Sequence, residues 1–124
     1  MSKILIVDDE PVIIDILTKL LLLNNFEVLS SVTGEDVIDI LNRGEKIDLV
    51  ILDMKMPKIR GTDILKKMRE FDMGVPVLIL TGSIDKYKHE EEFKQFGLNL
   101  DDVWQKPVDL YLLLEKIKSK LMKS

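Results

Sequence analysis

The sequence predicts an α/β domain in which a doubly wound, five-stranded parallel sheet is flanked by five helices. Short apolar runs alternate along the chain with longer amphipathic segments, five of each in series. Three of the short runs are apolar without alternation, which is typical of parallel strands that are covered on both faces. No internal repeat or Pro/Gly/Ser-rich linker interrupts the pattern, so we expect residues 1–124 to form one domain.

The boundaries of the elements follow from the same pattern. We expect strands at residues 4–7, 27–31, 49–52, 75–80 and, more weakly, 102–105. We expect helices at residues 10–24, 34–43, 61–71, 85–96 and 109–122. Pro11 suits the first turn of a helix, and acidic or capping side chains stand at the expected starts in residues 33–36 and at Asp109.

The first and last helices carry more apolar side chains than one buried face needs. In the first helix, the expected core residues are Ile13, Ile16, Leu17, Leu20 and Leu21, and those outside the core face are Val12, Ile14, Leu22 and Leu23. In the last helix, the expected core residues are Leu110, Leu113, Leu114, Ile117 and Leu121, and those left over are Tyr111 and Leu112. We expect Val12 and Ile14 to form part of a docking surface for a protein partner, because they lie at the end of the first helix nearest the strand tips.

Composition excludes several classes of function. The 124-residue chain is 46% hydrophobic and 32% charged, as expected for a globular domain. It has no cysteine, which excludes thiol nucleophiles, cysteine-ligated zinc and iron–sulfur clusters. The formal net charge of −4 argues against a general nucleic-acid surface. No signal peptide or membrane-spanning run is visible, so we expect a cytoplasmic protein that binds neither nucleic acid nor membrane directly.

Polar side chains follow four of the five expected strands, and the ligand site of such a sheet lies at the carboxyl ends of its strands. In chain order, the polar residues at these strand ends are Asp8 and Asp9, Asp53, Thr81 and Lys106; Gly82 follows Thr81, and Pro107 follows Lys106. Carboxylates that converge at one place repel one another unless a cation lies among them. Because hard oxygen ligands suit a magnesium-class ion, we expect Mg²⁺ there. A metal, an ammonium and a hydroxyl around one carboxylate are suited to holding phosphoryl oxygens during in-line transfer.

Each of these signals is weak alone, and their joint placement at strand ends is what favours a phosphoryl-transfer site. The chain lacks the glycine-rich fingerprint of dinucleotide-binding folds and the P-loop, and it has no Gly-x-Ser-x-Gly motif. His89, the one histidine, lies in a highly charged stretch and is expected to be an exposed helix residue. Met54 and Met56 are expected to pack beside the site.

With these motifs, the sequence resembles the receiver domains of bacterial two-component response regulators, which have a flavodoxin-like fold, over its whole length. The resemblance is carried by residues 4–11, by residues 53–57 with Gly61, by Thr81-Gly82 and by Lys106-Pro107. It implies that Asp53 accepts a phosphoryl group from a histidine kinase or a histidine phosphotransfer protein. It also implies that Mg²⁺ is bound directly by Asp9, Asp53 and the main-chain oxygen of Lys55, and through water by Asp8.

The resemblance further implies that Thr81 and Lys106 hold the phosphoryl oxygens. The domain would then catalyse its own phosphorylation and dephosphorylation without acting as an enzyme on other substrates. It would act on a downstream protein as a monomer or a weak, phosphorylation-dependent dimer. The Lys106-Pro107 peptide bond is expected to be cis.

Two features depart from the family pattern. Val103 stands three residues before Lys106, where the family usually has an aromatic side chain that turns inward on activation, and a valine cannot move in that way. Trp104 should lie on the opposite face of the strand, either in the core or on a signalling surface. The segment 97–102 is longer than is usual in the family.

Three alternatives remain open at this stage. In the first, the chain is the receiver portion of a longer transcription regulator or hybrid kinase. In the second, it is a pseudo-receiver that binds a partner without phosphoryl transfer. The third is a magnesium phosphohydrolase, but this chain has no visible second acid in the Asp-x-Asp arrangement that such enzymes use.

Overall fold

The computed structural model describes residues 1–54, 56, 59–70, 74–82 and 89–122. Five parallel strands form one sheet in the order β2-β1-β3-β4-β5, which confirms the predicted fold class. The strands are β1 (Lys3–Val7), β2 (Glu27–Ser31), β3 (Leu49–Leu52), β4 (Val77–Thr81) and β5 (Val103–Gln105). The strand order reverses direction after β1, which places the switch point between β1 and β3.

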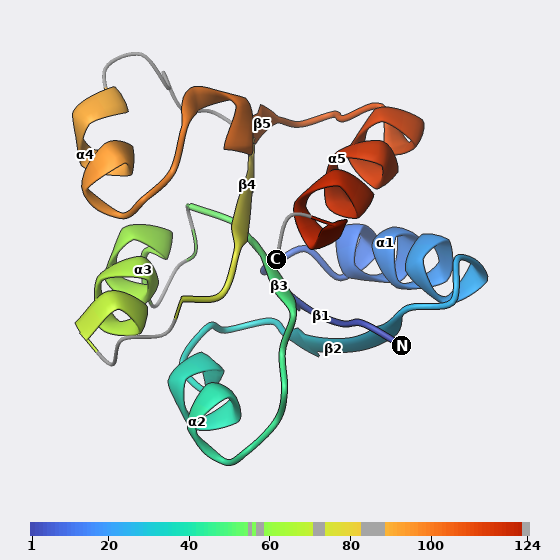
Figure 1. Ribbon diagram of the computed structural model, residues 1–124, viewed down its shortest axis with the longest axis horizontal. Helices are drawn as coiled ribbons and strands as arrows, with labels where there is room; N and C mark the ends of the chain where they lie inside the picture. Colours follow the sequence, from blue (N-terminus) through green and yellow to red (C-terminus); the bar gives the residue numbers. More distant parts are fainter. Residues whose placement is uncertain (55, 57–58, 71–73, 83–88, 123–124) are drawn as a thin grey trace.

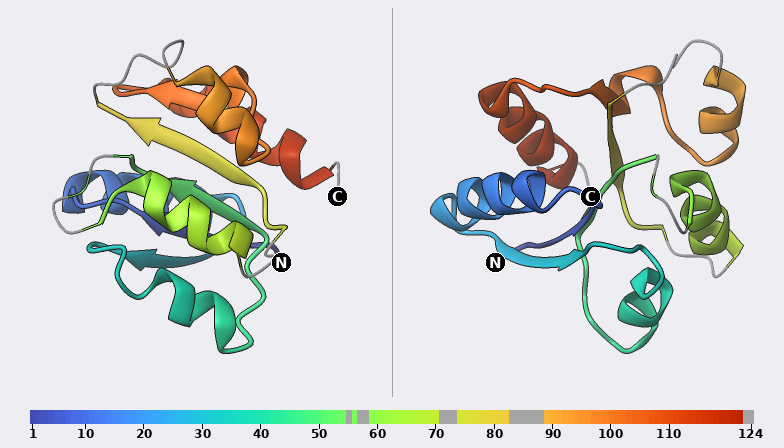
Figure 2. Two further views of the ribbon diagram at one scale, coloured as in Figure 1. Left: turned by 90° about the vertical axis from the view of Figure 1, so that its left-hand side faces the viewer. Right: turned by 180° about the vertical axis from the view of Figure 1, so that it is seen from behind.

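Five α-helices cover the two faces of the sheet (Figure 1). They are α1 (Pro11–Leu23), α2 (Val37–Asn42), α3 (Gly61–Glu70), α4 (Glu90–Gln95) and α5 (Leu110–Met122), and a 3₁₀ turn, η1 (Leu100–Asp102), precedes β5. Helices α1 and α5 lie on one side of the sheet, and α2, α3 and α4 lie on the other (Figure 1). The left view of Figure 2 shows that the N-terminus and the end of α5 lie at the edge of the sheet opposite the strand tips.

The core consists of two clusters, one on each face of the sheet. Strands β1, β3 and β4 are apolar without alternation because successive side chains enter different clusters, as Leu5 and Ile6 do in β1. The same rule separates Val103, which belongs to the cluster that includes residues of α2, α3 and α4, from Trp104, which packs against the cluster of α1 and α5. The indole N–H of Trp104 also donates to the Asp101 carbonyl at 3.0 Å.

The structure corrects three of the predicted core positions. Ile14 is half-buried against the core, whereas Ile16 is 40% exposed. These two residues lie at opposite edges of the apolar arc, and the rotation of α1 on the sheet, which hydrophobic periodicity does not determine, selects Ile14. Leu110 is 38% exposed; it is the first residue of α5, and the first buried residue of that helix is Leu113. Val12, Leu22, Leu23, Tyr111 and Leu112 are exposed, as expected of side chains outside the core face.

Several element boundaries also differ from the prediction. Helix α2 begins at Val37 rather than at residue 34, because Gly34 has a φ of +77°, in the left-handed region that ends helical geometry. The predicted helix at 85–96 is described only as Glu90–Gln95, since residues 83–88 lie outside the described residues. His89 is exposed as predicted, but it precedes α4 as its N-cap residue and does not lie within a helix. Met54 and Met56 are buried and the Lys106-Pro107 bond is cis, both as predicted. No described helix is both long enough and apolar enough to cross a membrane.

Ionic contacts attach α5 to the turn before β5. Asp102 is buried and forms ion pairs with Lys120 at 2.8 Å and with Lys116 at 3.6 Å. Asp101 forms an ion pair with Lys116 at 2.8 Å. The hydrogen bond from Lys116, together with its charge, lowers the pKa of the Asp101 carboxyl below its ordinary value. Asp101 and Asp102, at the end of the segment 97–102, therefore connect α5 to the turn before β5.

Candidate functional site

Inter-strand hydrogen bonds hold the predicted site residues at the carboxyl edge of the sheet. The amide of Asp53 donates to the Val7 carbonyl at 2.9 Å, so β3 carries Asp53 to the tip of β1. The amide of Asp8 donates to Ser31 at 3.1 Å, and that of Lys106 donates to Thr81 at 2.8 Å. The backbone ladder therefore continues one residue past the strands and fixes the main chain at these positions.

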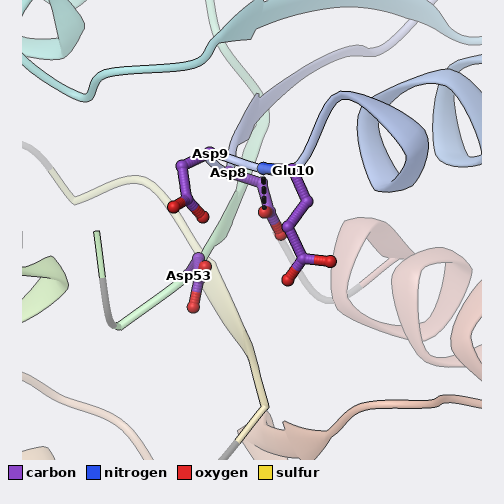
Figure 3. A group of neighbouring side chains, drawn as sticks. All are labelled: Asp8, Asp9, Glu10 and Asp53. Carbon is purple, nitrogen blue, oxygen red and sulfur yellow. Dashed lines mark hydrogen bonds between the residues drawn. The ribbon is translucent and has the colours of Figure 1, made fainter. Parts of the chain in front are cut away.

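Four carboxylates meet at this edge: Asp8, Asp9, Glu10 and Asp53. Each offers one oxygen that lies within 4.8 Å of the others, and Figure 3 shows the four side chains around the start of α1. Asp8 and Asp53 are buried, Asp9 is half-buried and Glu10 is exposed. The sequence predicts three of the four as site residues but not Glu10, for which the available signal is its position as the third consecutive acidic residue after the strand.

The ammonium of Lys106 lies among these carboxylates. Its Nζ is 2.8 Å from Asp8 Oδ2, 3.0 Å from Glu10 Oε1 and 3.5 Å from Asp53 Oδ2. Burial alone would lower the pKa of Lys106, but the hydrogen bonds to Asp8 and Glu10 and the charges of Asp8 and Asp53 outweigh it, and the net effect raises that pKa. Lys106 is therefore a permanent cation beside Asp53.

The hydroxyl of Thr81 is fully buried, and Oγ1 has no hydrogen-bond partner among the described residues. A buried hydroxyl without a partner costs stability, so such an atom at the rim of a polar site calls for an explanation. Gly82 follows it, and a Cβ placed there would meet no atom of the described residues within 4 Å. In the described part of the chain, the space beside the Thr81 hydroxyl is therefore not filled at Gly82.

Close packing at Gly61 fixes the segment after Asp53. The Gly61 amide donates to the Met54 carbonyl at 3.1 Å, and a Cβ at Gly61 would lie 2.6 Å from the Asp53 carbonyl oxygen and 2.8 Å from Met54 Cα. Only a glycine allows α3 to begin this close to the end of β3. Lys55, the remaining predicted metal-ligating residue, lies outside the described residues.

The donor set fits a hard divalent cation. Four carboxylates carry more negative charge than the single ammonium of Lys106 neutralises, and two of them are buried. Oxygen donors at this spacing suit Mg²⁺, which accepts one or two carboxylates and keeps several waters. Asp8, Asp9 and Asp53 supply such donors from two neighbouring strand ends.

Comparison with known proteins gives consistent matches. Residues 4–118 match the family model of the response regulator receiver domain. The chain is 36% identical over 126 residues to the transcriptional regulatory protein CpxR of Escherichia coli K12, covering 100% of this chain and 51% of that protein. It is 34% identical over 125 residues to the alkaline phosphatase synthesis transcriptional regulatory protein PhoP of Bacillus subtilis 168, covering 99% of this chain and 50% of PhoP. The chain thus spans about half the length of these relatives.

Solved structures match over nearly the whole chain. A response regulator receiver domain from Clostridium thermocellum is 31% identical with a TM-score of 0.84, and the match covers 99% of this chain and 96% of that one. The response regulator TrrA of Thermotoga maritima, solved in complex with Mg²⁺ and BeF, is 28% identical with a TM-score of 0.80. That match covers 97% of this chain and 99% of TrrA.

Proposed function

The chain belongs to the response regulator receiver domain family of two-component signalling, and we propose that Asp53 is the residue on which it accepts a phosphoryl group in an Mg²⁺-dependent reaction. The donor in this proposal is a phosphohistidine of a histidine kinase or a histidine phosphotransfer protein. The phosphorylated chain would then act as a switch on a downstream protein, or as a relay that passes the group on.

The observation that carries the proposal is the buried hydroxyl of Thr81, which has no hydrogen-bond partner among the described residues. It lies at the tip of β4, the strand next to the one that leads into Asp53. A phosphoryl group on Asp53 supplies acceptor oxygens for this hydroxyl. Lys106 lies 3.5 Å from Asp53 Oδ2 and brings a second donor, with positive charge, to the same place. Ion pairing alone would account for the position of Lys106, but not for a buried hydroxyl without a partner among the described residues.

The proposed reaction is a phosphoryl transfer between two side chains. A carboxylate oxygen of Asp53 forms a bond to phosphorus while the phosphorus–nitrogen bond of the donor histidine breaks. The imidazole nitrogen keeps the electron pair of that bond, and the ring takes a proton from solvent and leaves neutral. Lys106 and Thr81 hold equatorial oxygens, which stabilises the charge that spreads over them in the transition state.

Magnesium, when bound, offsets the negative charge of the site and of the phosphoryl oxygens. We propose that Asp9, Asp53 and the main-chain oxygen of Lys55 hold the ion directly and that Asp8 holds it through water. Asp8 also accepts Lys106 at 2.8 Å and the Glu10 amide at 2.9 Å, which fixes the orientation of its carboxylate. We further propose that the same groups let the domain hydrolyse its own acyl phosphate.

The test is to incubate the protein with acetyl phosphate and MgCl₂ and to measure the mass of the intact chain over time. We expect the addition of one phosphoryl group, and we expect none with EDTA in place of MgCl₂ or in Asp53→Asn, because an amide forms no acyl phosphate. Asp63→Asn, which changes an exposed carboxylate in the first turn of α3, is the matched control and should be labelled like the wild type. Full labelling of Asp53→Asn would contradict the proposal.

A further inference from the structure

Glu10 is the carboxylate of the cluster to which the proposed function gives no role. Its main chain is held from both sides: its amide donates to Asp8 Oδ1 at 2.9 Å, and its carbonyl accepts the amides of Ile13 and Ile14 at 3.1 and 3.2 Å. It is the N-cap residue of α1, but its side chain makes no capping hydrogen bond. The side chain instead reaches Lys106, at 3.0 Å.

The three carboxylates around Lys106 share its ammonium unequally. Asp8 and Glu10 lie at hydrogen-bond distance, 2.8 and 3.0 Å, whereas Asp53 lies at 3.5 Å, beyond the usual range of an N–H···O bond. The lysine is thus drawn toward the start of α1. In Figure 3 the carboxylate of Asp53 lies to the left of Asp8 and that of Glu10 lies to its right. A group bound to Asp53 would therefore attract Lys106 from a different direction than Glu10 does.

The two acids that hold Lys106 closely differ in exposure. The side chain of Asp8 is 3% exposed, whereas that of Glu10 is 55% exposed. Because the side chain of Glu10 is already in contact with water, its ion pair with Lys106 is the weaker and more easily broken of the two. Asp8 keeps its position through the Glu10 amide whether or not the Glu10 side chain is engaged.

We propose that Glu10 is a positioning residue that holds Lys106 on the α1 side of the site in the unphosphorylated protein and competes for it with the phosphoryl group on Asp53. This inference rests on the proposed function. It assigns Glu10 to the lysine rather than to the metal, although one of its oxygens lies within 4.8 Å of the other acids. As a consequence, Glu10 weakens the binding of a phosphoryl group, because Lys106 must break its ion pair with Glu10 before it can contact that group.

The experiment measures the affinity of the protein for beryllofluoride, a noncovalent analogue of a phosphoryl group on a carboxylate, at saturating Mg²⁺. The variants are Glu10→Gln, Lys106→Ala and the double variant, each confirmed as folded by circular dichroism. Asp15→Asn is the matched control: it removes the same charge from the same helix, at a side chain that is 63% exposed and paired with Lys19 instead of Lys106.

We expect Glu10→Gln to bind beryllofluoride roughly twofold to fivefold more tightly than the wild type, since it removes one partly exposed ion pair of Lys106. Asp15→Asn should bind like the wild type. In the Lys106→Ala background, Glu10→Gln should have no effect, because the residue for which Glu10 competes is absent. If Glu10 had only a structural role, Glu10→Gln would bind beryllofluoride more weakly than the wild type, and the loss would be the same with Lys106 or Ala at position 106.

Three results would overturn the inference. Weaker binding in Glu10→Gln, restored by higher Mg²⁺, would make Glu10 a metal ligand. The same gain in both backgrounds would mean that Glu10 acts by general charge repulsion, and unchanged binding in the single variant would mean that it does not compete. If wild-type protein with Mg²⁺ failed to bind beryllofluoride at all, both the inference and the proposed function would be wrong.

Discussion

The hydroxyl of Thr81 links the stability of the protein to its proposed chemistry. Because Oγ1 is buried and has no partner among the described residues, its desolvation is not offset in the unphosphorylated protein. The proposed phosphoryl group supplies the missing acceptor. The residue thus costs stability in one state and contributes binding in the other.

We therefore expect Thr81→Val, which replaces the hydroxyl by a methyl group of similar shape, to raise the free energy of unfolding by about 1 kcal/mol. The same variant should be labelled more slowly by acetyl phosphate, since one donor to the phosphoryl oxygens is lost. Urea unfolding and labelling time courses measure the two effects. A loss of stability of more than about 1 kcal/mol would mean that Oγ1 has a partner in the folded protein.

If the acidic cluster binds a metal ion as proposed, Lys106 competes with that ion for the carboxylates. We expect Lys106→Ala to bind Mg²⁺ as tightly as the wild type or slightly more tightly, because removal of the ammonium at 2.8 Å from Asp8 leaves that carboxylate to the ion. Its phosphorylation should fall roughly a hundredfold, as expected when one donor to the transition state is removed. Isothermal titration with MgCl₂ measures the Mg²⁺ affinity, and labelling with acetyl phosphate measures the rate of phosphorylation. Loss of Mg²⁺ affinity would instead show that Lys106 holds the carboxylates in place.

At the scale of the elements, the beginning of α3 packs directly against the main chain of Asp53 and Met54. We expect Gly61→Ala to lower the free energy of unfolding by about 1–3 kcal/mol, because its Cβ would meet main-chain atoms of residues 53 and 54 that cannot move aside easily. Thermal and urea unfolding measure this change. Gly74→Ala is the control, since its Cβ would meet nothing within 4 Å and should change stability by less than about 0.5 kcal/mol. Equal effects at the two glycines would contradict the role of close packing at Gly61.

The elements also show where prediction from sequence stops. The existence and order of strands and helices follow from the alternation of apolar runs, and the site follows from polar residues at strand ends, as with Asp53 and Thr81. The rotation of α1 does not follow, because Ile14 and Ile16 are equally apolar and only packing against the sheet distinguishes them. The contact between Glu10 and Lys106 joins residues 96 positions apart, and no local pattern indicates such a contact.

At the scale of the whole molecule, the exposed end of α1 nearest the acidic site is the predicted docking surface for a protein phosphodonor. From the sequence, Val12 and Ile14 are expected to form part of this docking surface. Val12 is 67% exposed, but Ile14 packs partly against the core, so a change at Ile14 would also affect the fold. Val12 is therefore the residue at which docking is best tested.

We expect Val12→Ser to slow transfer severalfold from a phosphorylated histidine phosphotransfer protein that labels the wild type, because an apolar contact beside the site is lost. Labelling by acetyl phosphate should not change, since a small donor needs no docking surface. Leu23→Ser, at the far end of the same helix and 82% exposed, is the control and should alter neither rate. Equal slowing with both donors would assign Val12 to the fold instead of to docking.

The central claim, that Asp53 is the phosphoacceptor, is tested most directly by locating the phosphoryl group. Protein labelled with acetyl phosphate and MgCl₂ is reduced with borohydride, which converts an aspartyl phosphate to an alcohol, and is then digested and mapped by mass spectrometry. We expect the reduced residue at position 53, and none in samples labelled with EDTA in place of MgCl₂. Reduction at Asp8 or Asp9 instead, or a phosphoryl group that maps to His89, would contradict the account.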